Sequence, residues 1–147
     1  EIVNSLINIG HVKYSQTKLD DAVDYYSRAI VLLKEFDSTN HLQIATIFYW
    51  IGIIRNRQRS FDRAIECLEQ CLKIREASLS PGESDITLIL SYLSKCYEHI
   101  NQFKTALEYY KQALYIYVQY SSNSFEQETM EDNIDRLSTI LNNLETE

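Results

Sequence analysis

The chain has 147 residues, which is enough for one compact domain that is stable without disulfides or metals. Its net charge of -7 repels a phosphate backbone, so nucleic acid is not expected as a partner. No stretch approaches the ~20 apolar residues of a membrane span, so membrane insertion is not expected either. Three glycines and one proline leave few helix breakers, and this favours long helices joined by short connections.

The sequence repeats itself with a period of 42 residues. Ala22, Ala64 and Ala106 set the register. Further columns then keep the same size of side chain: Leu6, Phe48 and Leu90; Ile9, Ile51 and Leu93; Gly10, Gly52 and Ser94; Tyr26, Leu68 and Tyr110. The small glycine and alanine columns are expected to let the two backbones of a hairpin approach closely. Because one hairpin cannot bury its own apolar face, the repeats are expected to stack.

Each repeat contains two segments with the apolar spacing of a helix. In chain order, the pattern predicts helices at 2–15, 20–34, 44–57, 62–77, 86–99 and 104–120. Polar turns such as 15–18 and 101–102 separate the two helices of a repeat. The segments 37–40, 79–82 and 121–124 have the composition of loops.

A last apolar stripe follows these segments, and it predicts one more helix. The stripe consists of Ile134, Leu137, Ile140, Leu141 and Leu144. We expect repeats at about 1–41, 42–84 and 85–125, followed by a capping helix at 126–147 that covers the third hairpin. The alternative is that the stripe docks on a partner chain.

The repeat motif resembles a known family. It reads Leu6-x2-Ile9-Gly10 and then Ala22-x3-Tyr26 in the first repeat, with the same order in the next two. This pattern resembles the tetratricopeptide repeat, and the 42-residue period is similar to that of kinesin light chains. Lys13 and Arg55 stand where the family usually has a tyrosine. The resemblance implies an all-α fold: an α-solenoid (superhelix) of three helix-turn-helix hairpins plus a C-terminal capping helix.

Motifs for chemistry are not found, so no enzyme and no cofactor are expected. The sequence has no phosphate-binding glycine loop and no metalloprotease or nucleophile-elbow motif. Cys67 and Cys71 have a spacing that suits metal ligands, but further ligands at local spacing are missing, so we read them as buried apolar residues. With Cys96 the cysteine count is odd, which fits a reducing, cytoplasmic location. The carboxylates around Asp20 are read as a solvated start of a helix.

A protein or peptide ligand is the expected partner. In tetratricopeptide solenoids the first helices line a concave groove, and this resemblance implies a peptide-binding groove. Its expected residues are Ile7, His11, Tyr14, Tyr49, Trp50, Ile53, Asn56, Arg57, Tyr92, Lys95 and His99. Aromatic and arginine anchors dominate binding at interfaces, so we expect a peptide with apolar anchors and some acidic residues. The alternative for Trp50 is that it packs against the neighbouring hairpin.

Two functions remain open from the sequence. The first is a protein–protein interaction scaffold without catalytic activity. The second is a regulatory or oligomerisation appendage of a larger multidomain protein, with an enzyme domain elsewhere. Glu1 and Ile2 begin inside a predicted helix, so we expect an uncapped apolar N-terminal edge through which the chain self-associates. The lysine, asparagine and arginine clamp that binds chaperone tails in some family members is missing from the matching columns.

Overall fold

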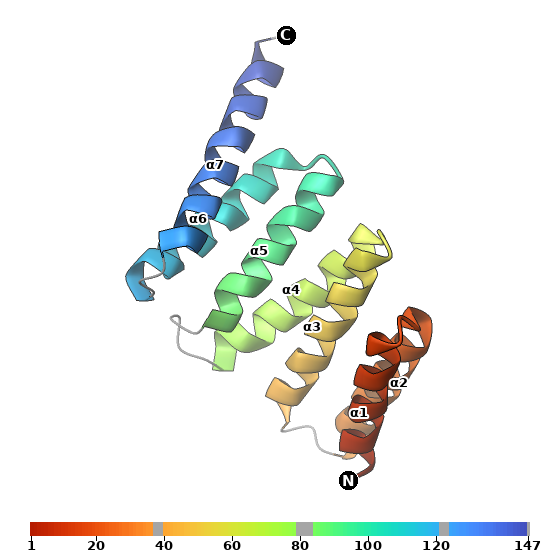
Figure 1. The fold of residues 1–147 in the computed structure, drawn as a ribbon. Helices are drawn as coiled ribbons and strands as arrows, with labels where there is room; N and C mark the ends of the chain where they lie inside the picture. Colours follow the sequence, from red (N-terminus) through yellow and green to blue (C-terminus); the bar gives the residue numbers. More distant parts are fainter. Residues whose placement is uncertain (37–39, 79–83, 121–123, 147) are drawn as a thin grey trace. The chain divides into compact units, whose positions relative to one another are not determined.

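The computed structural model describes residues 1–36, 40–78, 84–120 and 124–146, and these residues form seven helices and no strand (Figure 1). The helices are α1 (Ile2–Ser15), α2 (Leu19–Phe36), α3 (His41–Arg57), α4 (Phe61–Ser78), α5 (Ser84–His99), α6 (Phe103–Tyr120) and α7 (Ser124–Glu145). The predicted all-α helical repeat fold is confirmed, and every predicted helix is present. The expected loops fall largely on 37–39, 79–83 and 121–123, which lie outside the described residues.

The helices form two compact units, Glu1–Arg75 and Glu76–Glu147. In the first unit, α1 packs against α2 and α2 packs against α3. In the second unit, α5 packs against α6 and α6 packs against α7. The finer division of residues 1–125 into three 42-residue repeats stays a prediction.

The core of the first unit is built on the apolar faces of α1, α2 and α3. Tyr26 of α2 is completely buried, as are Ala22 and Ala29 on the same helix. Ile47 and Ile54 of α3 join this cluster. These residues recur three or four positions apart, so one face of each helix enters the core.

Two glycines on α1 and α3 make room for side chains of the following helix. A Cβ on Gly10 would lie 2.6 Å from Cε1 of Tyr26, and a Cβ on Gly52 would lie 2.7 Å from Cγ of Leu68. At Gly52 the backbone of the next helix also comes close, since Ala64 O lies 3.5 Å from that Cβ, whereas the three nearest atoms at Gly10 all belong to the ring of Tyr26. The space that they leave is filled mainly by the ring of Tyr26 and the side chain of Leu68.

The turn inside each hairpin has the same backbone conformation in all three cases. Thr17, Arg59 and Asn101, spaced by the 42-residue period, have φ of 61°, 59° and 61°. In the first turn, the N–H of Thr17 donates to Tyr14 O and the N–H of Lys18 donates to Lys13 O. Equivalent bonds recur at the other two turns. This is the Schellman arrangement, which uses carbonyls that the end of a helix leaves without partners.

In the second unit, α7 lies along α6 (Figure 1). Leu137 is completely buried together with Ala106 and Tyr110, and Ile134 and Ile140 pack around them. Much of the apolar stripe of α7 therefore contacts the chain's own α6, whereas Leu144 near its end is exposed.

Candidate peptide-binding surface

An aromatic cluster forms where α1 faces α3 in the first unit. His11 and Tyr14 are three residues apart on α1, which places both on one face of the helix. Trp50 of α3 lies against both rings. Its ring centroid is 5.0 Å from that of His11 and 5.6 Å from that of Tyr14, and the planes are steeply inclined. Tyr49 makes a similar edge contact with Trp50 at 5.8 Å. Edge-to-face geometry is favourable for aromatic pairs, so these contacts fix the indole in place.

Trp50 is half-buried and has two different sides. It packs against the core of the first unit. It also lines a pocket of about 380 Å³ together with Asn4, Ile7, Asn8, Gln43, Thr46 and Ile47. Trp50 thus contacts the neighbouring hairpin and also contributes surface to a hollow, and its role in peptide binding stays a prediction.

His11 connects the cluster to the core. Its Nδ1 lies 2.7 Å from the hydroxyl oxygen of Tyr26, and the two rings also meet edge to face at 5.5 Å. Burial lowers the pKa of His11. Burial, together with Tyr14, raises the pKa of Tyr26 to about 12. At neutral pH both groups are therefore uncharged, and the Tyr26 O–H donates to Nδ1 when the imidazole carries its proton on Nε2.

Side-chain amides run along one end of the pocket. The Nδ2 group of Asn40 donates to Oε1 of Gln43 at 2.9 Å, and Nε2 of Gln43 donates to Oδ1 of Asn4 at 2.8 Å. An amide can both donate and accept, which suits it to a peptide backbone. The repeat alignment did not identify these residues as site residues, because polar side chains at helix ends carry no signal of a shared pocket.

Basic residues flank the cluster, and they behave differently. The guanidinium carbon of Arg57 lies 5.1 Å from the centre of the Tyr14 ring, and Arg57 is exposed. Arg55 is instead held by Asp20 at 3.4 Å, and Lys13 lies 3.6 Å from Asp21. The two cations that replace the family's tyrosine thus pair with the carboxylates at the start of α2. Both carboxylates stay exposed to solvent while they take part in these ion pairs.

The other predicted site residues are distributed as follows. Ile53 is 7% exposed, so it supports the surface and offers little area of its own. Asn56 is half-buried at the end of α3. Tyr92, Lys95 and His99 lie on α5 in the second unit, where Lys95 Nζ stands 5.9 Å from the centre of the Tyr92 ring. The structure thus brings together the aromatic residues of α1 and α3 with Arg57.

The described residues offer no metal centre, because no group of three or more His, Cys, Asp or Glu converges among them. Cys67, Cys71 and Cys96 take part in no disulfide. Burial raises the pKa of Cys67, and likewise that of Cys96, to about 11, so these thiols are poor nucleophiles. None of the described helices is long and apolar enough to cross a bilayer.

Sequence comparisons identify relatives of the chain. The tetratricopeptide repeat profile matches residues 1–77 and 43–117. The clustered mitochondria protein homolog of Brugia malayi is 30% identical over 111 residues, which are 76% of this chain and 8% of that protein. The chain therefore spans only a small part of the length of this relative.

Structural comparisons agree with the sequence profile. BtubC (BKLC) from P. vanneervenii superposes with a TM-score of 0.82 at 16% identity, over 93% of this chain and 55% of that one. A protein of Podosopora anserina that is assigned as a kinesin light chain with TPR-like repeats superposes with a TM-score of 0.74 at 14% identity, over 92% of this chain and 64% of that one. Repeats of this fold are typically non-catalytic. The chain belongs to the tetratricopeptide repeat family, whose members serve as protein-interaction scaffolds.

Proposed function

We propose that the surface formed by α1 and α3 binds an extended or helical peptide segment of a partner protein. The observation that carries the proposal is the position of Trp50, which is held by three aromatic neighbours and borders a pocket lined by amides. A ring that is already fixed loses little freedom when a ligand covers it. Aromatic residues of this kind are frequent binding hot spots.

The chemistry around Trp50 suggests which peptide fits. Ile7 and Trp50 offer apolar area for an anchor side chain, and Asn4, Asn8 and Gln43 offer amides for a peptide backbone. Arg57 is exposed beside Tyr14 and gives the surface a positive edge. A peptide with an apolar anchor and neighbouring acidic residues matches this set.

The test uses short fluorescein-labelled peptides with a central Leu or Phe flanked by glutamates. We expect Trp50→Ala to weaken binding at least about tenfold, because truncating a central aromatic typically removes over ~1.4 kcal/mol. Phe36→Ala is the matched control, since Phe36 is an exposed aromatic of the same unit. Trp50 is the only tryptophan, so its emission also reports binding directly in the wild type. Unchanged affinity in Trp50→Ala would refute the proposal.

A second candidate is self-association within a larger protein. Ile2 and Val31 are exposed on α1 and α2 and border a hollow of about 380 Å³ with Leu6 and Leu32. In the oligomerisation role, a second copy of the chain would bind to this face and cover it. Sedimentation at rising concentration tests it, and Val31→Glu should shift any dimer back to monomer. A monomer at all concentrations would exclude it.

We also propose a cytoplasmic location, because three cysteines outside any disulfide suit a reducing compartment.

A further inference from the structure

A pocket in the second unit lies outside the surface proposed above. It has a volume of about 500 Å³, within the roughly 300–1,000 Å³ range of ligand sites. Helices α5, α6 and α7 all contribute to it. Its lining residues are Asp85, Thr87, Leu88, Ser91, Lys95, Tyr110, Ile116, Tyr117, Tyr120, Glu126, Thr129, Met130 and Asn133.

The base of the pocket is apolar and fixed. Met130 and Tyr117 are each more than nine-tenths buried, and Tyr110 is almost completely buried. In contrast, Leu88 is 45% exposed and Tyr120 is 61% exposed. A buried base with exposed apolar residues can enclose a large side chain from a ligand and remove its apolar surface from water.

The repeat explains why this pocket is larger than the one beside Trp50. With the 42-residue period applied twice, Ser91 occupies the position of Ile7, and Lys95 occupies the position of His11. Serine is much smaller than isoleucine, so the side chain at this position leaves more space in the pocket. Lysine is long and flexible, whereas His11 is fixed by Tyr26. At these two positions the pocket of the second unit is therefore lined by a smaller and a more flexible side chain than the matching positions of the first unit.

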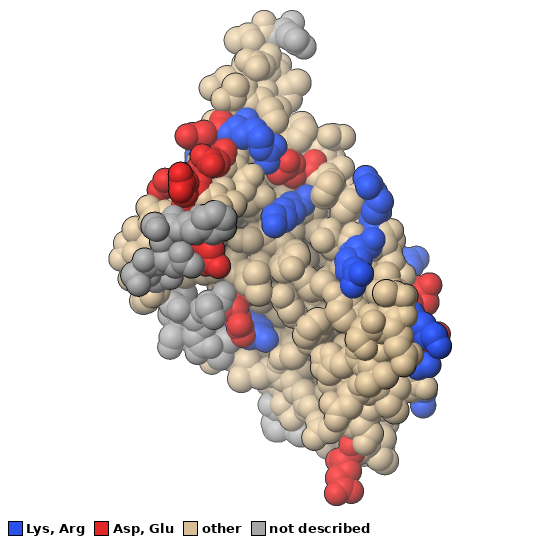
Figure 2. Space-filling model, viewed as in Figure 1, with Lys and Arg blue, Asp and Glu red and all other residues tan. Residues whose placement is uncertain are grey.

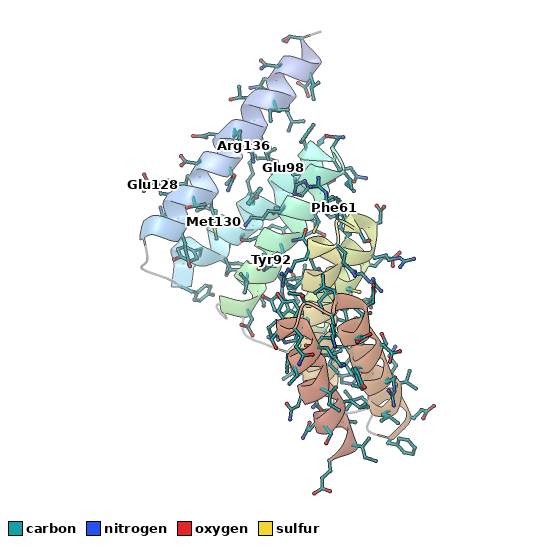
Figure 3. The ribbon with its side chains drawn as sticks, turned by 45° about the vertical axis from the view of Figure 1, so that its right-hand side comes forward. Phe61, Tyr92, Glu98, Glu128, Met130 and Arg136 are labelled. Atoms are coloured by element: carbon teal, nitrogen blue, oxygen red, sulfur yellow. The ribbon has the colours of Figure 1, made fainter. Side chains whose placement is uncertain are left out.

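The charged residues in and around the pocket indicate which ligand it favours. Glu126 and Asp85 line it and are exposed, and Lys95 is the cation among its lining residues. Helix α7 carries further carboxylates at Glu128, Glu131, Asp132 and Asp135. Figure 2 shows acidic side chains gathered over α7. Arg136, the arginine of this helix, pairs with Glu98 at 2.8 Å (Figure 3). The surroundings of the pocket are thus predominantly negative.

We propose that this pocket binds a peptide that inserts a large apolar side chain and places a lysine or arginine beside it, against Glu126. The inference extends the proposed function to a second peptide class, and it stands on residues that the first surface does not use. The acidic-flanked peptide expected on the first surface is disfavoured here by the carboxylates of α7.

The test measures fluorescence anisotropy with three labelled peptides: one with a central Phe flanked by lysines, one with Phe flanked by glutamates, and one with Ala flanked by lysines. In the Trp50→Ala chain, whose first surface should no longer bind, we expect binding of the lysine–Phe peptide alone. Leu88→Ala and Ser91→Trp should each weaken it at least about tenfold. Leu144→Ala is the control, because Leu144 is an exposed leucine that does not line the pocket.

The contribution of negative charge to binding is tested with a matched pair of substitutions on α7. Glu126→Gln should weaken the lysine–Phe peptide about threefold at low salt, and the effect should fade at high salt. Glu128→Gln should have a clearly smaller effect, because Glu128 lies outside the pocket on the outer side of α7 (Figure 3). Equal or tighter binding of the glutamate-flanked peptide to the Trp50→Ala chain, or no effect of the pocket variants, would overturn the inference.

Trp50→Ala separates the two proposals. We expect this variant to keep its affinity for the lysine–Phe peptide. If Trp50→Ala abolished that binding while Leu88→Ala left it unchanged, the peptide would belong to the first surface, and the pocket of the second unit would not be its site. Failure of the glutamate-flanked peptide to bind at all would refute the first proposal and leave the second intact.

Discussion

The hydroxyl of Tyr26 meets Nδ1 of His11 at 2.7 Å, and this hydrogen bond joins the buried core of the first unit to its aromatic surface. We expect Tyr26→Phe to lower the free energy of unfolding by about 0.5–1.5 kcal/mol, because it removes the hydrogen bond and keeps the ring. Urea denaturation followed by circular dichroism measures the change. No loss of stability would mean that water replaces the hydroxyl without penalty.

Stability should also depend on the protonation of His11. Burial lowers its pKa in the folded chain, so below the ordinary pKa of about 6.5 the unfolded chain binds more protons. The free energy of unfolding should therefore fall as pH drops from about 7 towards 5.5. His11→Asn should flatten this dependence, whereas the exposed residue His41 serves as the control in His41→Asn. An unchanged slope in His11→Asn would contradict the prediction.

Adding a methyl group at Gly10 should destabilise the first unit. The new Cβ would lie 2.6 Å from the rigid ring of Tyr26, and overpacking of this kind typically costs about 1–3 kcal/mol. The better helix propensity of alanine offsets up to about 1 kcal/mol of that cost. Thermal unfolding of Gly10→Ala gives the net value, and Ser5→Ala on the exposed side of α1 is the control. A Gly10→Ala chain as stable as Ser5→Ala would show that the ring moves away freely.

The three turns predict a graded series of stabilising substitutions. Thr17, Arg59 and Asn101 each adopt positive φ, which costs an ordinary residue about 1–2 kcal/mol. The penalty is largest for a β-branched residue and smallest for asparagine. Glycine removes it but adds freedom to the unfolded chain. We expect Thr17→Gly to stabilise by about 0.5–1 kcal/mol, Arg59→Gly by less, and Asn101→Gly hardly at all. Melting temperatures in the reverse order would refute this reasoning.

The thiols should react slowly while the chain is folded. With a pKa of about 11, Cys67 and Cys96 are almost entirely protonated at pH 8, and the thiolate is the reactive form. We expect reaction with Ellman's reagent to be slower than that of a free cysteine by about two orders of magnitude, and to become fast in urea. Rapid labelling of the folded chain would show that α4 or α5 opens readily.

The helices could be predicted from the sequence because apolar periodicity reports which face of a helix is buried. The same periodicity could not show how deeply an individual side chain is buried. Ile53 was placed on the binding face by its column, yet it is buried. The ring contacts of Trp50 and the amide chain through Gln43 also depend on how α1 meets α3, and one helix's pattern does not contain that geometry. The carboxylate partners of Lys13 and Arg55 on α2 likewise could not be identified from the sequence pattern.

The pocket beside α7 was not predicted as a pocket, although the sequence placed Lys95, one of its lining residues, in the expected groove. Ser91 and Lys95 have no common signature in the sequence, and a vacant volume arises only when a small residue faces residues from two other helices. The repeat alignment could have pointed to it, since Ser91 is the small member of a column that holds Ile7 and Tyr49.

The shared turn geometry has a consequence for how this chain tolerates change. Each hairpin is closed by main-chain hydrogen bonds at a fixed register, and the side chains at the turn differ in all three. The angle between paired helices thus depends mainly on the main-chain hydrogen bonds of the turn and only weakly on which side chains the turn carries. The turn sequences should therefore be exchangeable. If the four residues of one turn replace those of another hairpin, the two helices of that hairpin should keep their positions.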